Sequence, residues 1–416
     1  MQLTPLARLL ADAFRLWHSR DWDGERIAAY QRRHLLKMLR YAVANVPFYS
    51  ALGLDGQAIH CVADLERFPV ITKANVQERG REFLSREFSP SRLKHSKSSG
   101  MSGEPTVTYF DARCWWLTRY ALKLRRVLSD TKLRRQRVLL VSEQPARRPQ
   151  SPLLRLLSPV LAVRTLSLSA DLAASLQELR EFRPTLIYGF PSWLLALARA
   201  ASEAGIALPS VPLVYTSSEV LTAATRRTLE AAYGARVVDI YGSTEFKEIA
   251  VQCVHGRYHV NFESVYVESV PRVEDGVPRL LVTTLMNEAM PLVRYDLGDT
   301  GRVEEGVCPC GRHGPYLLEL AGRLSEVLAF PDGTRLSPYL LTTVIEQRET
   351  VHHFRIVHEG AWDLRIELFA PAWTAADERD LENSLKQVLP ADVRLRFVAL
   401  ATRGTYAKRR AVSREF

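Results

Sequence analysis

The 416-residue sequence predicts an α/β fold: a large N-terminal domain with mainly parallel sheets and a β-rich subdomain, plus a small α+β C-terminal domain. Between residues 137 and 246, strand-like apolar runs alternate strictly with helix-like segments, which is typical of βαβ units and a parallel sheet. After Ala250 the pattern changes to short β-type runs, which predict a more antiparallel, partly barrel-like subdomain. We expect residues 1–323 to form the large domain and residues 324–416 the small one.

Helix signals support this organisation. Near the N-terminus, five apolar residues share one face of a helix that ends before Pro47; they are Leu35, Leu36, Leu39, Ala42 and Val43. Later in the chain, Pro191 stands in the first turn of a predicted helix and Gly205 follows its end. Thr222 and Gly234 are the expected N-cap and C-terminal glycine of the next helix.

Polar residues follow three successive strands of the predicted parallel sheet. The endings are Tyr188-Gly189-Phe190, Ser217-Ser218-Glu219 and Tyr241-Gly242-Ser243-Thr244-Glu245. The carboxyl ends of parallel strands lie on one edge of a sheet, where ligands of α/β proteins collect. The sequence therefore predicts a ligand site at this edge, although such transitions are also found in plain turns.

A loop rich in serine and glycine precedes this region. Four serines and two glycines lie between Ser96 and Gly103, and a β-rich run from Thr106 to Phe110 follows Pro105. Backbone N–H groups and hydroxyls in such a turn can cradle phosphate. The same letters also suit a plain linker, and the spacing is not that of GxxxxGK[ST], so composition leaves both interpretations open.

Composition indicates a soluble protein, which we expect in the cytoplasm. The net charge is +10, and no apolar run approaches the length of a membrane span. The basic segment 122–138 could attract an anionic partner, but an arginine-rich solvated face is the simpler interpretation. We therefore expect no nucleic-acid partner and no stable membrane insertion; a homodimer stays open. The five cysteines are too few and too unevenly placed for a disulfide framework.

Cysteine and histidine residues near the β-rich region suit a metal ion. Cys253 and His259 are followed about 50 residues later by Cys308 and Cys310, which gives four ligands for a closed tetrahedral zinc site. His255 is an alternative ligand. Unligated buried thiols remain a second interpretation, because Cys-x-Cys is tighter than the usual pair spacing.

Several motifs resemble the adenylate-forming superfamily, and most closely its phenylacetate-CoA ligase-like branch, which includes CapK-type proteins. SSGMSGEPT resembles the family's SSGTTGKPT, and DIYGSTE its DIYGxTE or DIYGLSE. LVTTLMNEAMPLVRYDLGD resembles LVLTTLTKEALPLIRYRTGD, and CPCGR and the later Gly322-Arg323 match in order and spacing. The resemblance covers nearly the whole chain and implies the adenylate-forming ligase fold.

The resemblance implies a site for ATP and Mg²⁺. Glu245 would bind Mg²⁺, Asp299 would bind the ribose hydroxyls beside Arg323, and the ring of Tyr241 would face the adenine. The nucleotide-binding residues that it implies are, for the phosphates, Ser98, Ser99, Gly100, Ser102 and Gly103, and, around the base and the DIYGSTE turn, Ser218, Glu219, Asp239, Tyr241, Gly242, Ser243 and Thr244. The family's branch also binds structural zinc at positions similar to the Cys/His cluster.

The implied function is ATP-dependent activation of an aryl or fatty acid to an acyl adenylate and its transfer to a thiol, normally coenzyme A. A hinge would fall at residues 324–326. The chain departs from the family at Glu104, which replaces a phosphate-loop lysine, at Ser325, and at Gly404-Thr405, where the adenylation lysine is expected. Lys408 is the nearest lysine and the predicted catalytic cation, and Arg409 is an alternative if the tail shifts register.

Two alternatives follow from these departures. The chain could be a degenerate relative that binds nucleotide or acyl ligand as a regulatory or partner protein. It could also be an adenylating ligase that transfers the acyl group to an amine. The sequence does not identify the acid.

Overall fold

The computed structural model describes residues 5–97, 106–131, 136–142, 161–168, 170–271, 278–323, 328–336, 341–342, 344–345, 348, 350–400 and 412–414. The chain divides into two compact units. Unit 1 comprises Met1–Leu133 and Ile240–Leu320, and unit 2 comprises Arg134–Asp239 and Ala321–Phe416. The predicted boundary between residues 323 and 324 stays a prediction.

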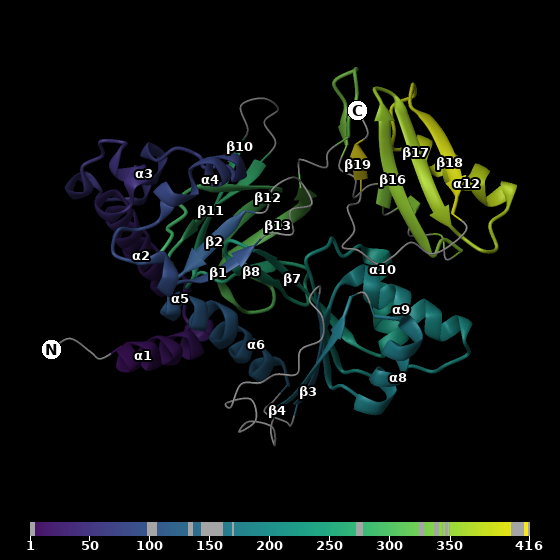
Figure 1. Cartoon of the computed structure of the whole chain (residues 1–416), viewed down its shortest axis with the longest axis horizontal. Helices are drawn as coiled ribbons and strands as arrows, with labels where there is room; N and C mark the ends of the chain where they lie inside the picture. Colours follow the sequence, from purple (N-terminus) through teal and green to yellow (C-terminus); the bar gives the residue numbers. More distant parts are fainter. Residues whose placement is uncertain are drawn as a thin grey trace. The chain divides into compact units, whose positions relative to one another are not determined.

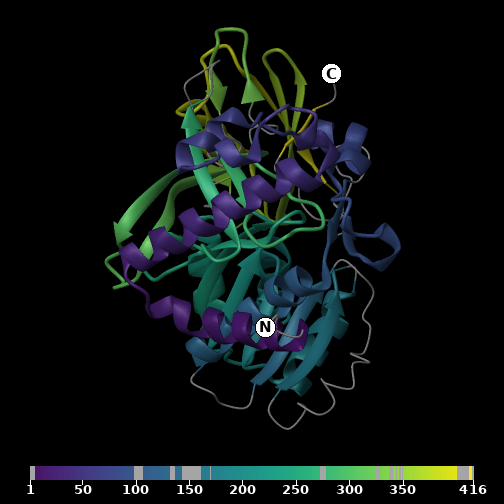
Figure 2. The ribbon, with the colours of Figure 1, turned by 90° about the vertical axis from the view of Figure 1, so that its left-hand side faces the viewer.

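The described helices of unit 1 lie in the N-terminal third of the chain. They are α1 (Pro5–His18), α2 (Gly24–Asn45), α3 (Pro47–Ser50), α4 (Lys73–Arg79), α5 (Ala112–Trp116) and α6 (Leu122–Thr131), with a π-helical turn at Leu117–Ala121 and short 3-10 turns at Ser19–Asp21, Gly56–Ala58, Val62–Arg67, Gly80–Phe83 and Pro90–Arg92. Figure 2 shows α2 as the long purple helix on the side of unit 1 that faces the viewer. Its predicted apolar face is confirmed, because Leu35, Leu39, Ala42 and Val43 are buried in the unit's largest core cluster.

The strands of unit 1 form antiparallel pairs (Figure 1). They are β7 (Arg236–Ser243), β8 (Lys247–Gln252), β9 (Tyr258–Val260), β10 (Val265–Pro271), β11 (Pro278–Thr284), β12 (Tyr295–Val307) and β13 (His313–Arg323), in the order β10-β11-β12-β13-β9-β8-β7. The residues of β7 before Ile240 and those of β13 after Leu320 belong to unit 2. A separate hairpin pairs β1 (Lys94–Lys97) with β2 (Val107–Phe110). The predicted antiparallel character after Ala250 is confirmed, with the strands in an open linear order.

Unit 2 contains the βαβ region. Its strands β3 (Gln136–Ser142), β4 (Leu161–Ser167), β5 (Leu186–Gly189) and β6 (Leu213–Ser217) alternate with α8 (Leu172–Phe182), α9 (Pro191–Glu203) and α10 (Ala223–Tyr233). The pairs β3–β5 and β5–β6 are parallel, as predicted, and β3–β4 is parallel as well. Thr222 caps α10, and Gly234 ends it in the left-handed region at φ 58°. Strand β4 was missing from the prediction.

The C-terminal part of unit 2 has its own sheet and core. Strands β16 (His353–Gly360), β17 (Asp363–Phe369), β18 (Arg394–Ala399) and β19 (Val412–Arg414) pair in the order β18-β17-β16-β19. Helix α12 (Ala375–Lys386) packs its Leu381 and Leu385 into the apolar cluster of this sheet. Strands β14 (Leu328–Ala329) and β15 (Arg335–Leu336) pair with each other in a separate antiparallel sheet. This part of the chain has the predicted α+β character.

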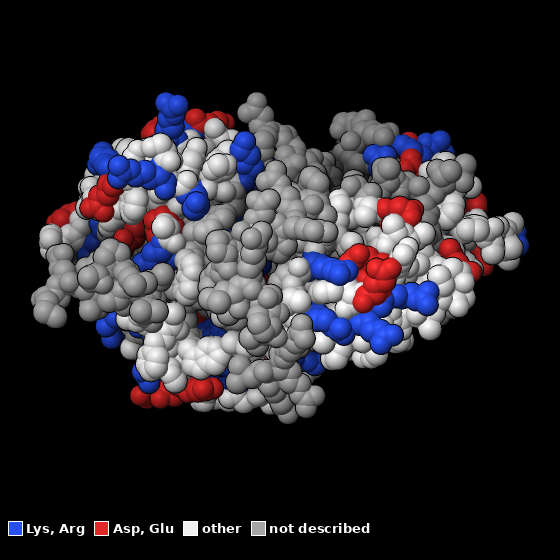
Figure 3. Space-filling view, turned by 60° about the horizontal axis from the view of Figure 1, so that its bottom comes forward, with Lys and Arg blue, Asp and Glu red and all other residues white. Residues whose placement is uncertain are grey.

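The interpretation of segment 122–138 as a solvated basic face was wrong for two of its arginines. Arg125 forms an ion pair with Glu263, and Arg126 forms one with Glu248; both carboxylates are buried. These guanidinium groups neutralise buried acids and are not offered to an external anion. On the face drawn in Figure 3, basic and acidic side chains also lie interspersed. No helix in the described ranges combines the length and the hydropathy needed to cross a membrane.

Candidate active site and metal centre

The turn between β7 and β8 carries the DIYGSTE motif, and glycine is required in it. The pairing of the two strands shifts register between Tyr241 and Gly242. A Cβ atom at Gly242 would lie 2.2 Å from the carbonyl oxygen of Lys247, which no side chain can accept. The turn is closed further by Ser243, whose hydroxyl accepts a hydrogen bond from the N–H of Phe246 at 3.2 Å. The sequence thus fixes the backbone that presents Thr244 and Glu245.

Two predicted nucleotide residues meet in unit 1. The hydroxyl of Tyr241 donates to Oδ2 of Asp299 at 2.7 Å, although the residues are 58 positions apart. Asp299 lies in β12 and is only 9% exposed. A hydrogen bond to a carboxylate is stronger than one between neutral groups, so it fixes both the tyrosine ring and the acid. Tyr241 is partly buried, so the phenol ring keeps some exposed surface.

Glu245 is held by a residue that the sequence analysis did not select. The hydroxyl of Tyr295 donates to Oε1 of Glu245 at 3.2 Å, and Tyr295 is 2% exposed. The ring of Tyr295 packs against Phe246 with centroids 5.8 Å apart. Tyr295 orients one carboxylate oxygen of Glu245, which is partly buried. A carboxylate oxygen is the kind of ligand that a hard cation such as Mg²⁺ prefers. The RYD run that resembles the family was the available signal for Tyr295.

The other predicted adenine residues belong to unit 2. Ser218 follows β6 in the left-handed region at φ 74°. The carboxylate of Glu219 accepts two hydrogen bonds at 2.9 Å, from the backbone N–H and the hydroxyl of Ser192, so it is held at the start of α9. Asp239 accepts a hydrogen bond from the hydroxyl of Thr216 at 2.6 Å and is buried. Glu219 after β6 and Asp239 within β7 are therefore each held by groups of unit 2 itself.

Several predicted residues lie outside the described residues. These are the phosphate-loop residues Ser98, Ser99, Gly100, Ser102, Gly103 and Glu104, the hinge 324–326, and the tail with Gly404, Thr405 and Lys408. Arg323 ends β13. Their roles stay predictions from the resemblance.

Lys247 lies beside the DIYGSTE turn and was not selected from the sequence. Its ammonium group donates to the carbonyl oxygen of Thr244 at 2.8 Å and to the hydroxyl of Ser96. It also lies over the rings of Phe110 and Trp115, at 4.3 and 5.3 Å from their centroids. Burial lowers the pKa of Lys247 to about 7. No sequence signal marked this lysine, because β-type runs commonly carry solvent-exposed lysines at their ends.

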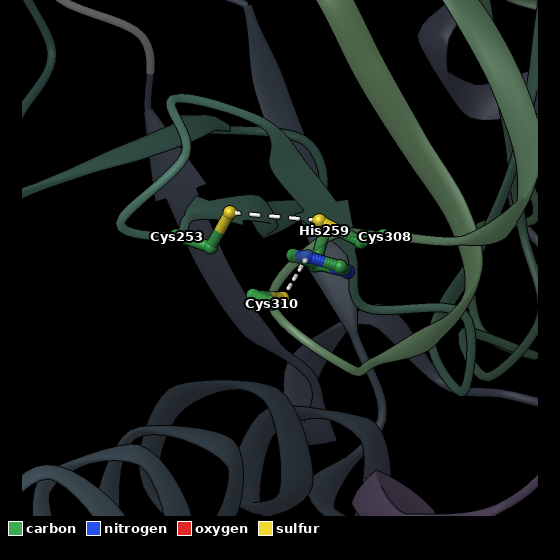
Figure 4. Close-up of side chains that lie close together, drawn as sticks. All are labelled: Cys253, His259, Cys308 and Cys310. Atoms are coloured by element: carbon green, nitrogen blue, oxygen red, sulfur yellow. Dashed lines mark hydrogen bonds between the residues drawn. The ribbon is translucent and has the colours of Figure 1, made fainter.

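The predicted metal ligands lie together in unit 1 (Figure 4). The ligand atoms of Cys253, His259, Cys308 and Cys310 all lie within 4.8 Å of one another. The sulfur atoms of Cys253 and Cys308 are 3.8 Å apart, and Sγ of Cys310 is 3.2 Å from Nε2 of His259. Two thiolates about 2.3 Å from a tetrahedral zinc ion stand roughly 3.8 Å apart, so the spacing fits zinc. His255 is exposed and does not belong to this cluster.

Two similar turns present the cysteines. The N–H of Gly256 donates to the carbonyl of Cys253 at 3.0 Å, and the N–H of Gly311 donates to that of Cys308 at 2.8 Å. Both glycines have positive φ, 76° and 86°, which favours glycine at these positions. Burial, with a smaller effect of nearby arginines, lowers the pKa of His259 to about 4. The imidazole is therefore neutral at pH 7, which is the form that binds metals.

The fold and the arrangement of the motif residues resemble those expected of an adenylate-forming ligase. No family model matches the chain. Phenylacetate-coenzyme A ligase of Thermus thermophilus is 26% identical over 395 residues, which cover 89% of this chain and 87% of that protein. The corresponding ligase of Pseudomonas putida is 25% identical over 376 residues, with 82% of each chain covered. Protein CapK of Staphylococcus aureus is 23% identical over 288 residues, covering 66% and 62%.

Solved structures agree with these relatives. The structure of 2-hydroxyisobutyryl-CoA ligase in the postadenylation state, in complex with 2-HIB-AMP, has a TM-score of 0.77 and 20% sequence identity. The match covers 94% of this chain and 90% of that one. The predicted α/β fold and the resemblance to the adenylate-forming superfamily and its phenylacetate-CoA ligase-like branch are confirmed.

Proposed function

We propose that this protein is an ATP-dependent acid:thiol ligase. It activates a carboxylic acid to an acyl adenylate and then transfers the acyl group to a thiol, normally coenzyme A. The relatives named above are CoA ligases and CapK, and the chain aligns with the phenylacetate-CoA ligases over most of its length.

The hydrogen bond between Tyr241 and Asp299 is the observation that carries this proposal. Both residues were assigned to the nucleotide from separate motifs, and the fold brings them to 2.7 Å. The phenol ring offers a face for the adenine, and the carboxylate offers acceptors for ribose hydroxyls. Glu245 lies six residues after Asp239 in the same motif and would hold Mg²⁺. The ion would neutralise phosphate charge as pyrophosphate leaves.

The chain's own residues act mainly by positioning. Tyr295 holds Glu245, and Asp299 holds Tyr241, so nucleotide binding costs little further ordering of these side chains. The serine- and glycine-rich loop, with Ser98, Ser99, Gly100, Ser102 and Gly103, is proposed to bind the β- and γ-phosphates. The first step joins a carboxylate oxygen to the α-phosphorus and releases pyrophosphate. The thiol then displaces AMP.

The Cys/His cluster is proposed as a structural zinc site. Four protein ligands close the coordination sphere of a tetrahedral ion, which leaves no position for a substrate. The cluster joins the turn after β8 to the turn between β12 and β13. We also propose that residues 324–416 form a small mobile domain, with the hinge at residues 324–326, that serves the two half reactions in turn.

Pyrophosphate exchange with a panel of acids tests the adenylation step. The panel contains phenylacetate, benzoates, fatty acids and short hydroxy acids, and coenzyme A is then added to detect acyl-CoA by mass spectrometry. We expect exchange and one acyl-CoA product with at least one acid class. ATP binding without exchange for any acid would contradict the proposal. It would favour the degenerate relative that binds nucleotide or acyl ligand, which the departures at Glu104 and Thr405 keep as the second candidate. Exchange without acyl-CoA would favour transfer to an amine.

A further inference from the structure

The ammonium group of Lys247 is held at a fixed place inside unit 1. It donates to the backbone carbonyl of Thr244 at 2.8 Å and to the hydroxyl of Ser96. It also sits on the face of Phe110, which is 1% exposed. Each of these partners is uncharged. Among the residues that the structure describes, no carboxylate lies within the ion-pair distance of 4.0 Å of this ammonium.

The backbone is shaped to place this side chain. Lys247 has φ 66°, a left-handed conformation that residues with a Cβ rarely adopt. The missing side chain of Gly242 makes room for the carbonyl oxygen of Lys247, which would otherwise lie 2.2 Å from a Cβ atom. A strained residue whose partly buried cation has no described carboxylate within 4.0 Å, and only a longer-range attraction from Glu245, suggests that function, not stability, maintains the arrangement.

The ammonium lies between two segments that the proposed function already uses. On one side is the turn with Thr244 and Glu245. On the other side is the β1–β2 hairpin, where Ser96 pairs with Thr108. These segments belong to one unit, so their relation is fixed. An anion placed between them would supply the close counter-charge that no described carboxylate provides within 4.0 Å.

We propose that Lys247 is a catalytic cation of the adenylation step and contacts the oxygens of the substrate carboxylate and of the α-phosphate where they meet. This inference rests on the proposed function. The step forms a bond between a carboxylate oxygen and phosphorus and breaks the bond to the pyrophosphate oxygen, which leaves with the electron pair; no proton is transferred. The positive charge offsets the repulsion between the two anions. The family's lysine for this role is missing, because Gly404 is followed by Thr405, and Lys408, the cation predicted from the resemblance, lies outside the described residues.

The test compares Lys247→Met with Lys247→Arg in the full chain, using pyrophosphate exchange with the preferred acid. The methionine variant keeps the length of the side chain and removes the charge, and the arginine variant keeps the charge. Lys37→Met is the control, because Lys37 is a surface lysine with 69% side-chain exposure. We expect Lys247→Met to lower the exchange kcat by roughly 100-fold, the scale of a lost charge-stabilising donor. We expect Lys247→Arg to retain at least about a tenth of the wild-type rate, and the KM for ATP to change less than about threefold.

The outcomes separate the inference from the function on which it rests. If the Lys247→Met variant has a pyrophosphate-exchange rate within about threefold of wild type and an unchanged circular dichroism spectrum, the inference is overturned. The proposed ligase function is not affected by that result. Equal losses in the methionine and arginine variants also overturn the inference, since they would show a structural role. Wild-type protein that binds ATP but exchanges with no acid refutes the proposed function, and the inference with it.

Discussion

Arg126 and Glu248 form a buried ion pair, and removing the arginine should destabilise unit 1 by about 3 kcal/mol. Their side chains are 9% and 5% exposed, and Nη2 of Arg126 lies 3.2 Å from Oε1 of Glu248. Breaking a buried pair on one side typically costs about 3–5 kcal/mol, because the remaining charge stays in a poorly polarisable interior. Nζ of Lys123 lies 3.5 Å from the same carboxylate and partly replaces the lost charge. The lower end of the range therefore applies to Arg126→Met.

Urea unfolding of a double-mutant cycle measures this value. The cycle contains wild type, Arg126→Met, Glu248→Leu and the double variant. We expect the double variant to unfold within about 1 kcal/mol of wild type, because apolar side chains replace both charges. Lys37→Met is the matched control; it breaks an exposed pair with Glu288 and should cost less than about 1 kcal/mol. The reasoning fails if Arg126→Met costs no more than this control, or if the double variant loses the sum of the single losses.

Three further predictions concern pH, the nucleotide and the metal. Burial acts to raise the pKa of Glu248, but Arg126 and a neighbouring lysine outweigh this effect and lower the pKa below its usual 4.5. The stabilisation by the ion pair should therefore hold above pH 4.5 and disappear as the pH falls through the folded-state pKa. In unfolding titrations at acid pH, the difference in free energy of unfolding between wild type and Arg126→Met should shrink accordingly. Tyr241→Phe should raise the KM for ATP roughly threefold to tenfold through loss of a hydrogen bond to a carboxylate, and an unchanged KM would speak against this residue as part of the nucleotide site. The purified protein should contain about one zinc ion per chain by atomic emission; Cys308→Ser should lose it and Cys61→Ser, at an exposed thiol, should keep it.

Much of the fold follows from local sequence rules. The Thr222 cap and the glycine at position 234 bound α10 because a hydroxyl acceptor and a left-handed residue satisfy its end groups. Alternating strands and helices lead to parallel pairing because each helical crossover returns the chain to the end of the sheet at which the preceding strand began. Strand β4 escaped this reasoning. Its seven residues are partly buried or exposed, so its apolar signal is weak.

The candidate site was predictable where a motif carried it. Tyr241, Glu245 and Asp299 were selected from two motifs, and the four metal ligands from their residue types and order. Tyr295, the partner of Glu245, was not selected, because it becomes a neighbour of the DIYGSTE turn only through the tertiary fold. The surroundings of Arg125 were also predicted wrongly from the sequence. Its basic surroundings indicated solvent, whereas the fold places a buried carboxylate, Glu263, beside it.

The contacts of Lys247 were not predicted, because its backbone does not follow the alternation of side chains on which strand predictions rely. Successive residues of a strand normally point to opposite faces, so Lys247 and Glu248 should have different neighbours. The left-handed conformation of Lys247 removes this alternation. Both side chains therefore contact one helical segment, Lys247 through Trp115 and Glu248 through Arg126. The ion pair of Glu248 anchors the strand to this segment and thereby fixes the ammonium next to it. We therefore expect Arg126→Met to lower exchange activity as well as stability, because it loosens the support of the lysine without touching it.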